Sequence, residues 1–71
     1  MIYKVSYVEE SGQYPGGIKN EAEPPRIGDQ VQIGRRKFKI VSIEEILPPR
    51  ENFQYLQATV AYIDTEKQTQ P

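Results

Sequence analysis

Hydrophobic and polar side chains alternate along most of this chain with the two-residue period of β-strands. Residues 2–9 form the first predicted strand, and three apolar side chains share one of its faces: Tyr3, Val5 and Tyr7. Residues 30–34 alternate in the same way. Residues 53–64 form the longest predicted strand, with one face made by Leu56, Ala58, Val60 and Tyr62. Because successive side chains of a strand point to opposite sides, each segment is predicted to bury one face.

A further strand, KFKIVSIEEIL, starts near Lys37 and contains an interruption of this alternation. Phe38 and Ile40 fall on one face of a regular strand. Val41 and Ile43 then fall on the opposite face, so four apolar residues cannot share one side. We therefore expect one extra residue, a β-bulge or a sharp bend near residues 40 to 42, of the kind that turns corners in small barrels.

The basic segment IGRRKFKI predicts a hairpin with two possible registers. A four-residue loop from Gly34 to Lys37 would place Ile33 opposite Phe38. A two-residue loop, Gly34-Arg35, would place Ile33 opposite Arg36. Both registers keep the apolar side chains on one face, and the first pairs them better. In either register Arg35 and Arg36 are at the tip.

Two proline-containing segments separate the predicted strands. Residues 10–26 show no alternation and contain a Pro-Gly-Gly turn signal and a Pro-Pro pair. We expect a long, partly disordered loop that Tyr14 or Ile18 attaches to the core. Residues 47–52 form the second connector, because prolines cannot donate hydrogen bonds to a ladder.

The pattern as a whole predicts an all-β fold, a small four- to five-stranded antiparallel meander that is closed or half closed. No segment has apolar residues at helical spacing with a cap. The chain of 71 residues, 37% of them hydrophobic, forms one small domain with a thin core. We expect this domain to span residues 1–64, followed by a flexible C-terminal tail, residues 65–71.

The segments PPRIGDQVQIGRRKFKIVSIEEI and QATVAYID resemble the strand–hairpin–strand unit of small SH3-like barrels. In those barrels a Gly-Asp turn introduces a strand, a short hairpin follows, and a bent strand completes the pair. The resemblance covers roughly residues 25–64 and implies an SH3-like, partly open barrel. The chain lacks the second-strand glycines of the KOW type and the clustered aromatic residues of a proline-peptide groove or a methyl-lysine cage. The resemblance therefore implies no site residue.

Cysteine and histidine are both absent from the sequence. Their absence removes disulfides, thiolate nucleophiles, the commonest zinc ligands and the side chain that most often transfers protons near neutral pH. Glu44 and Glu45 are adjacent and point to opposite faces of a strand, which is the wrong geometry for a carboxylate pair acting on one bond. We therefore expect no enzymatic activity, no cofactor and no metal.

The net charge is −1, but the charge is unevenly distributed. Residues 26–50 carry six cationic and three acidic side chains, whereas the segments on either side are each acidic overall. The candidate binding residues are the basic side chains of this middle segment and two tyrosines: Arg35, Arg36, Lys37, Lys39, Arg50, Tyr14 and Tyr55. The guanidinium group of an arginine at a hairpin tip can form two parallel hydrogen bonds to a carboxylate or a phosphate. The alternative is that the charges at the tip are only solvated.

Three kinds of partner follow from these features. We expect a protein-interaction module that docks on a larger assembly through strand edges, residues 10–26 and the Arg35/Arg36 hairpin, with an acidic patch on the partner. The alternative is nucleic-acid binding, in which the same basic residues contact phosphates and a tyrosine stacks on bases. A homodimer could form if residues 2–9 lay at a sheet edge. No signal peptide or long apolar run is present, so we expect a soluble, cytoplasmic protein without membrane contact.

Overall fold

The computed structural model describes residues 1–63, and all regular secondary structure within them is β-strand. Asp64 and the expected tail lie outside this range. Five strands form one sheet: β1 (Ile2–Glu9), β2 (Gly17–Glu21), β3 (Gln30–Ile33), β4 (Arg36–Arg50) and β5 (Phe53–Tyr62). Their order is β2-β1-β5-β4-β3. The all-β fold is therefore confirmed, but the pairing of β1 with β5 is parallel, so the sheet is mixed and not an antiparallel meander.

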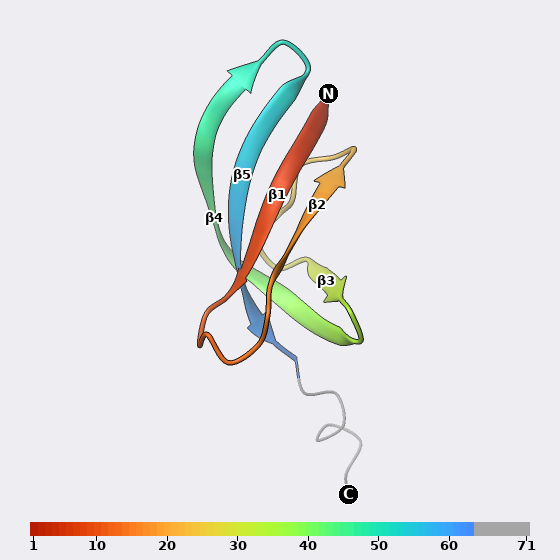
Figure 1. Cartoon of the computed structure of the whole chain (residues 1–71), viewed down its shortest axis with the longest axis vertical. Coiled ribbons are helices and arrows are strands. Elements are labelled where there is room, and N and C mark those ends of the chain that lie inside the picture. Colours follow the sequence, from red (N-terminus) through yellow and green to blue (C-terminus); the bar gives the residue numbers. More distant parts are fainter. Residues whose placement is uncertain (64–71) are drawn as a thin grey trace, which may run out of the picture.

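The sheet curls until its two edge strands approach each other, which makes a nearly closed barrel (Figure 1). Lys19 on β2 donates a hydrogen bond from Nζ to the carbonyl oxygen of Gln32 on β3. The two strands also approach at Gly17, where an added Cβ atom would be 3.5 Å from the side chain of Ile33. We call this place, where β2 faces β3, the seam. This architecture is consistent with the small SH3-like barrel that the sequence resembles.

The core lies inside the barrel and follows the alternation of the strands. Its buried cluster consists of Val5, Tyr7, Phe38, Ile40, Ala58 and Val60, with Leu56 also buried. These residues come from β1, β4 and β5, each of which contributes every second residue, as expected for a sheet with one covered face. Tyr62 shares this face but lies at the end of the barrel and is 37% exposed.

The predicted bulge in β4 is confirmed. Ile40 pairs with Val60, and Ser42 pairs with the next residue of β5, Thr59, so that Val41 is the extra residue. Val41 is exposed, whereas Ile43 returns to the inner face and packs against the core. The extra residue thus brings three of the four apolar side chains onto one face.

Of the two registers possible for the basic hairpin, the one with the two-residue loop forms. Ile33 pairs with Arg36 and Val31 pairs with Phe38, so the loop is the two-residue Gly34-Arg35. Gly34 has a φ of 63°, which suits the first central position of a type II′ turn. The backbone twist of this turn matches that of the strands, and this match outweighs the better pairing of apolar side chains in the register with the longer loop.

Residues 10–26 are not a loop throughout, because they contain β2. Tyr14 attaches the segment to the core, whereas Ile18 is 59% exposed. β2 pairs with β1 along its whole length, and β5 covers the other side of β1. Residues 2–9 therefore have no free edge through which a second copy could pair.

The expected connector at residues 47–52 was also too long. β4 continues through Pro48 and Pro49 to Arg50, and only a two-residue turn separates it from β5. β3 pairs with β4 only up to Lys39, so the other edge of β4 is unpaired beyond that point. Prolines are tolerated on such an edge because no donor is needed there.

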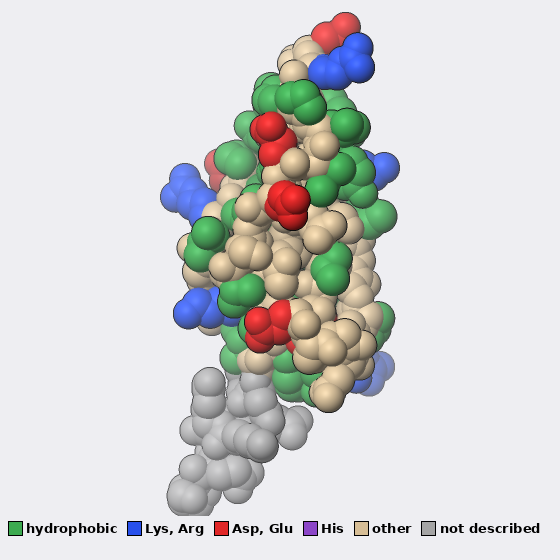
Figure 2. Space-filling view, turned by 90° about the vertical axis from the view of Figure 1, so that its left-hand side faces the viewer, with side chains coloured by type: hydrophobic (Ala, Val, Ile, Leu, Met, Phe, Trp, Pro, Cys, Tyr) green, Lys and Arg blue, Asp and Glu red, His purple; other side chains and the backbone are tan. Residues whose placement is uncertain are grey.

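At one end of the sheet, the β4–β5 hairpin and the start of β1 form an extension, which we call the ribbon (residues 2–4 and 44–55; Figure 1). The end of β2 borders it, because Tyr3 and Lys4 pair with Glu21 and Asn20. None of its side chains is fully buried. Figure 2 shows hydrophobic side chains gathered around this upper end, with acidic side chains between them. Within residues 1–63 no helix is both long and apolar enough to cross a membrane.

Candidate functional site

Two of the predicted site residues close one end of the barrel. The ring of Tyr14 lies 4.5 Å from that of Tyr62 and 6.3 Å from that of Phe38, measured between centroids. The guanidinium carbon of Arg36 lies 5.0 Å from the centroid of Tyr14. This distance is typical of a cation–π contact. Tyr14 therefore packs against the core and Arg36 lies over Tyr14, which is a structural use of both side chains.

The other predicted residues do not form one surface. Arg35 is at the tip of the hairpin, and Lys37 and Lys39 are exposed on the face of β4 that points away from the core. Arg50 and Tyr55 belong to the ribbon, near the opposite end of the 15-residue strand β4. The ring of Tyr55 is 5.9 Å from Nζ of Lys4. The structure thus divides the seven residues into two groups.

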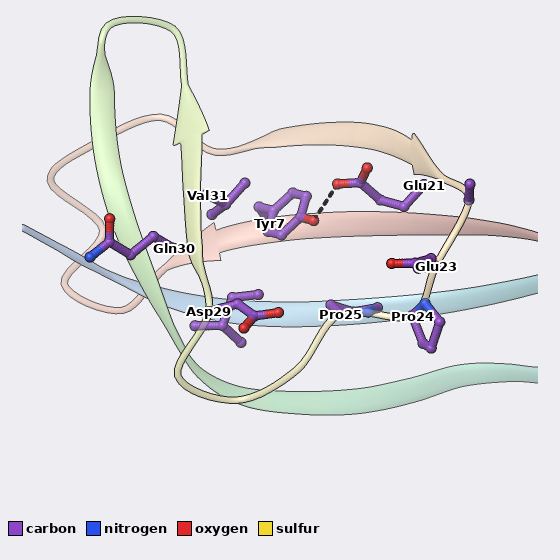
Figure 3. A pocket seen from close by; sticks show the side chains of 10 residues that line it. Tyr7, Glu21, Glu23, Pro24, Pro25, Asp29, Gln30 and Val31 are labelled. Atoms are coloured by element: carbon purple, nitrogen blue, oxygen red, sulfur yellow. Dashed lines mark hydrogen bonds between the residues drawn. The ribbon is translucent and has the colours of Figure 1, made fainter.

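A cleft of about 450 Å³ opens at the seam of the barrel, between β2 and β3 (Figure 3). The seam is narrow near Gly17 and Ile33 and widens toward the end of β2, where residues 22–29 cross from β2 to β3. Ten residues line the cleft: Tyr7, Glu21, Ala22, Glu23, Pro24, Pro25, Asp29, Gln30, Val31 and Ile40. Its volume is in the range of small-ligand and side-chain pockets.

Tyr7 forms the polar part of the floor of this cleft. Its ring is 3% exposed, and its hydroxyl donates a hydrogen bond of 2.8 Å to Oε2 of Glu21 (Figure 3). Burial raises the pKa of Tyr7, and the hydrogen bond to Glu21 and the negative charges of Glu21 and Asp29 raise it further. Tyr7 therefore stays a neutral donor that holds the Glu21 carboxylate at the wall of the cleft.

The remaining walls combine negative charge with apolar surface. Glu23 and Asp29 add two carboxylates, and Figure 3 shows them apart from each other, both below Tyr7 in this view. Apolar surface comes from the prolines and from Val31. No group of three possible ligands within residues 1–63 is arranged to hold a metal ion. The chemistry of the cleft instead suits an organic cation with an aliphatic stem, as in lysine or arginine.

Local backbone features explain why these side chains meet. Gly16 passes so close to β1 that a Cβ atom on it would be 1.9 Å from the carbonyl oxygen of Tyr7. Pro24 and Pro25 hold the crossing segment extended. Gly28, with a φ of 97°, then lets the chain turn so that Asp29 accepts a backbone hydrogen bond of 2.8 Å from Ile40. The amide of Gly28 also donates a hydrogen bond of 2.8 Å to the carbonyl oxygen of Ile40, so two bonds hold the backbone at Asp29 beside buried Ile40.

Sequence reasoning missed this cleft. Its residues come from β1, the end of β2, the crossing segment, β3 and β4, and no periodic pattern connects them. The only local sign is the stretch EAEPPRIGD, in which three acidic residues flank two prolines. Comparisons with models of protein families, with curated proteins and with solved structures gave no match to this chain.

Proposed function

We propose that this protein is a non-enzymatic protein-interaction module that binds an extended, basic segment of a partner protein in the cleft between β2 and β3. The observation that carries the proposal is the composition of the cleft. Three carboxylates surround apolar walls at a place where two strand edges diverge. Concave sites of this mixed kind position a side chain by its charge and bind its stem by burial.

The aliphatic stem of a lysine or arginine side chain matches the apolar walls of the cleft, and its cationic group matches the carboxylates. Its aliphatic stem would lie on Pro25 and Val31, and its cationic group would reach Glu23 and Asp29. A charge-assisted hydrogen bond to a carboxylate is roughly twice as strong as a neutral one. The unpaired outer edges of β2 and β3 offer backbone groups to an extended segment on either side of that residue.

This proposal keeps two of the surfaces expected from the sequence and changes the third. The strand edges and residues 21–25 of the former long loop contribute directly. The hairpin contributes less, because Arg36 is in contact with Tyr14. Nucleic-acid binding stays a prediction, with Arg35 and the outward lysines of β4 as its basic surface.

Selection from a displayed peptide library tests the proposal. Wild-type protein is expected to enrich peptides that carry Lys or Arg at one fixed position. In the Glu23→Gln/Asp29→Asn variant, which removes two charges without changing size, we expect affinity for the enriched peptides to fall at least about tenfold, about 1.4 kcal/mol. The matched control, Glu10→Gln/Glu51→Gln, removes two exposed carboxylates elsewhere and should bind as the wild type does.

Circular dichroism establishes that each variant is folded. Enrichment of acidic or purely apolar peptides, or equal affinity in all three proteins, would overturn the proposal. Titration with a labelled oligonucleotide at low salt covers the alternative: binding that disappears in Arg35→Glu/Lys39→Glu would support nucleic-acid recognition.

A further inference from the structure

In the ribbon, apolar side chains other than Tyr3, which packs against the core, occupy the opposite face from the one they occupy in the barrel. Val5 and Leu56 point to the inner face, but Ile2 and Phe53, which pair with each other at the end of β1 and β5, point to the outer face. In β4 the change is made by a second bulge, which turns Leu47 to the outer face. The inner face of the ribbon instead carries a polar pair, in which Gln54 donates a 2.7 Å hydrogen bond to Glu45.

The outer face of the ribbon is therefore a continuous apolar patch. Ile2 pairs with Phe53, and Leu47 pairs with Tyr55. Phe53 and Tyr55 are two residues apart on one strand and so are neighbours on the same face. Ile2 is 52%, Leu47 49% and Phe53 40% exposed. A patch of this kind on a small soluble chain is typical of an interface.

Two opposite charges flank this patch at equal steps on β4. Glu44 pairs with Gln57, Leu47 with Tyr55 and Arg50 with Phe53, so each three-residue step on β4 matches a two-residue step on β5. Both steps contain a bulge, and for this reason all three side chains lie on the outer face. Glu44 and Arg50 are thus placed symmetrically about Leu47.

We propose that the outer face of the ribbon binds the same face of a second copy of this chain, in a twofold-symmetric dimer. The axis lies between the two sheets and crosses the strands at Leu47, which therefore contacts its own counterpart. The same rotation brings Arg50 of each copy opposite Glu44 of the other, so two ion pairs form. We infer that the partner is a second copy of this chain because the patch carries both Glu44 and Arg50, which complement each other when the patch faces itself.

One side chain opposes this association. Lys4 pairs with Tyr55 and is therefore at the same level as the axis, where it approaches the Lys4 of the other copy. The amino group rests near the Tyr55 ring, 5.9 Å from its centroid, which moderates the repulsion. We accordingly expect a reversible dimer, and Lys4→Gln should tighten it.

Sedimentation equilibrium from micromolar to millimolar concentration tests the dimer. We expect wild-type protein to dimerise and Leu47→Glu to be monomeric. Glu44→Arg and Arg50→Glu should each raise the dissociation constant about tenfold or more, which corresponds to about 1.4 kcal/mol. The double exchange, Glu44→Arg/Arg50→Glu, restores opposite charges and should return the constant to near the wild-type value.

The double exchange separates this arrangement from a nonspecific apolar contact. Failure of the double variant to recover, a dimer that survives Leu47→Glu, or a wild-type monomer at every concentration would each overturn the proposal. Circular dichroism verifies folding of every variant. Glu23→Gln/Asp29→Asn, which changes the cleft, should leave dimerisation unchanged, so the outcome does not depend on peptide binding.

Discussion

The ribbon is built from three of the five strands of the barrel, yet the two regions use the alternation of those strands in opposite ways. In the barrel, β1, β4 and β5 bury their inner face, where Phe38 is completely inaccessible. In the ribbon the same strands present apolar side chains outward, and Phe53 is 40% exposed. The difference teaches that alternation fixes which residues share a face but not whether that face is covered.

β4 shows where the change takes place. Its first part, up to Ile40, alternates between buried and exposed side chains, whereas none of its residues after Ile40 is buried. The register shifts between Ile40 and Ser42, between Glu45 and Leu47, and again before Arg50. Each shift reverses the face on which the following residues lie. The bulges therefore decide which part of β4 stabilises the fold and which part presents a surface.

The largest effect should come from two equivalent truncations, one in each region. We expect Phe38→Ala to lower the free energy of unfolding by about 3–5 kcal/mol, because it removes a fully buried ring and leaves a cavity. Phe53→Ala should cost less than about 1 kcal/mol, since its ring is already partly in water. Urea unfolding followed by circular dichroism, at a concentration low enough to keep the chain monomeric, measures both.

A loss of several kcal/mol could unfold so small a domain, because domains of this size have little stability to spare. Phe38→Leu is therefore the graded variant, with a smaller loss expected at the same site. Equal losses at residues 38 and 53 would contradict the division into a stabilising barrel and an exposed ribbon.

The second effect concerns the contact that joins β2 to the barrel. We expect Gly16→Ala to cost about 2–3 kcal/mol, because its new Cβ would lie 1.9 Å from the backbone oxygen of Tyr7. Gly34→Ala is the matched control. A Cβ atom at this position would have no atom within 4 Å, so the only cost is the backbone strain of a φ of 63°, about 1 kcal/mol. Thermal unfolding of the two variants ranks them, and a larger loss at Gly34 would contradict the close contact.

Much of the barrel could be predicted from the sequence, because its strands carry the signal in their side chains. The alternation in β1 and β5 and the bulge after Ile40 all follow from residues that enter the core. β2 could not be predicted in this way. Its inward positions are Gly17, Lys19 and Glu21, so no apolar period marks a strand that is held mainly by its backbone pairing with β1.

The site was predictable only in part, for a related reason. The sequence identified exposed basic residues, but contact with Tyr14 uses one of them, and the length of β4 separates Arg50 from the rest. The cleft depends on the seam between β2 and β3, two strands at opposite edges of the sheet. Which edges meet is decided by the curl of the whole sheet, and no local pattern encodes it.

A third, smaller effect compares two tyrosines. Tyr7→Phe removes the hydroxyl that bonds to Glu21 and should cost about 1 kcal/mol at neutral pH. Tyr55→Phe changes a half-buried ribbon residue and should cost less than about 0.5 kcal/mol. The pKa of Tyr7 in the folded state is above its ordinary value of 10.0, so its contribution to stability is complete below pH 10.

As the pH rises above 10, the unfolded chain loses this proton while the folded chain keeps it. The stability of the wild type should therefore fall in alkali relative to that of Tyr7→Phe, and the difference between them should shrink. Urea unfolding at neutral and alkaline pH measures that difference. A difference that stays constant across this range would show that the hydroxyl is not held in the buried bond.

The smallest effect separates two carboxylates, one from each region. Glu9, at the end of β1, is 6% exposed and accepts hydrogen bonds from the hydroxyl of Ser11 and from the backbone amide of Gln13. Chiefly the Ser11 bond lowers the pKa of Glu9 below its ordinary value of 4.5, although burial opposes this shift. Its contribution to stability is therefore present above pH 4.5 and is lost as the pH falls through the lowered value.

We expect Glu9→Gln to be less stable than the wild type at pH 7, with the difference disappearing in acid. Glu45→Gln changes a carboxylate on the exposed ribbon and should cost less at pH 7. Urea midpoints at pH 7 and pH 3 measure the stability of both variants. A greater loss for Glu45→Gln would mean that the ribbon holds the more stabilising carboxylate, which would contradict the division into a stabilising barrel and an exposed ribbon.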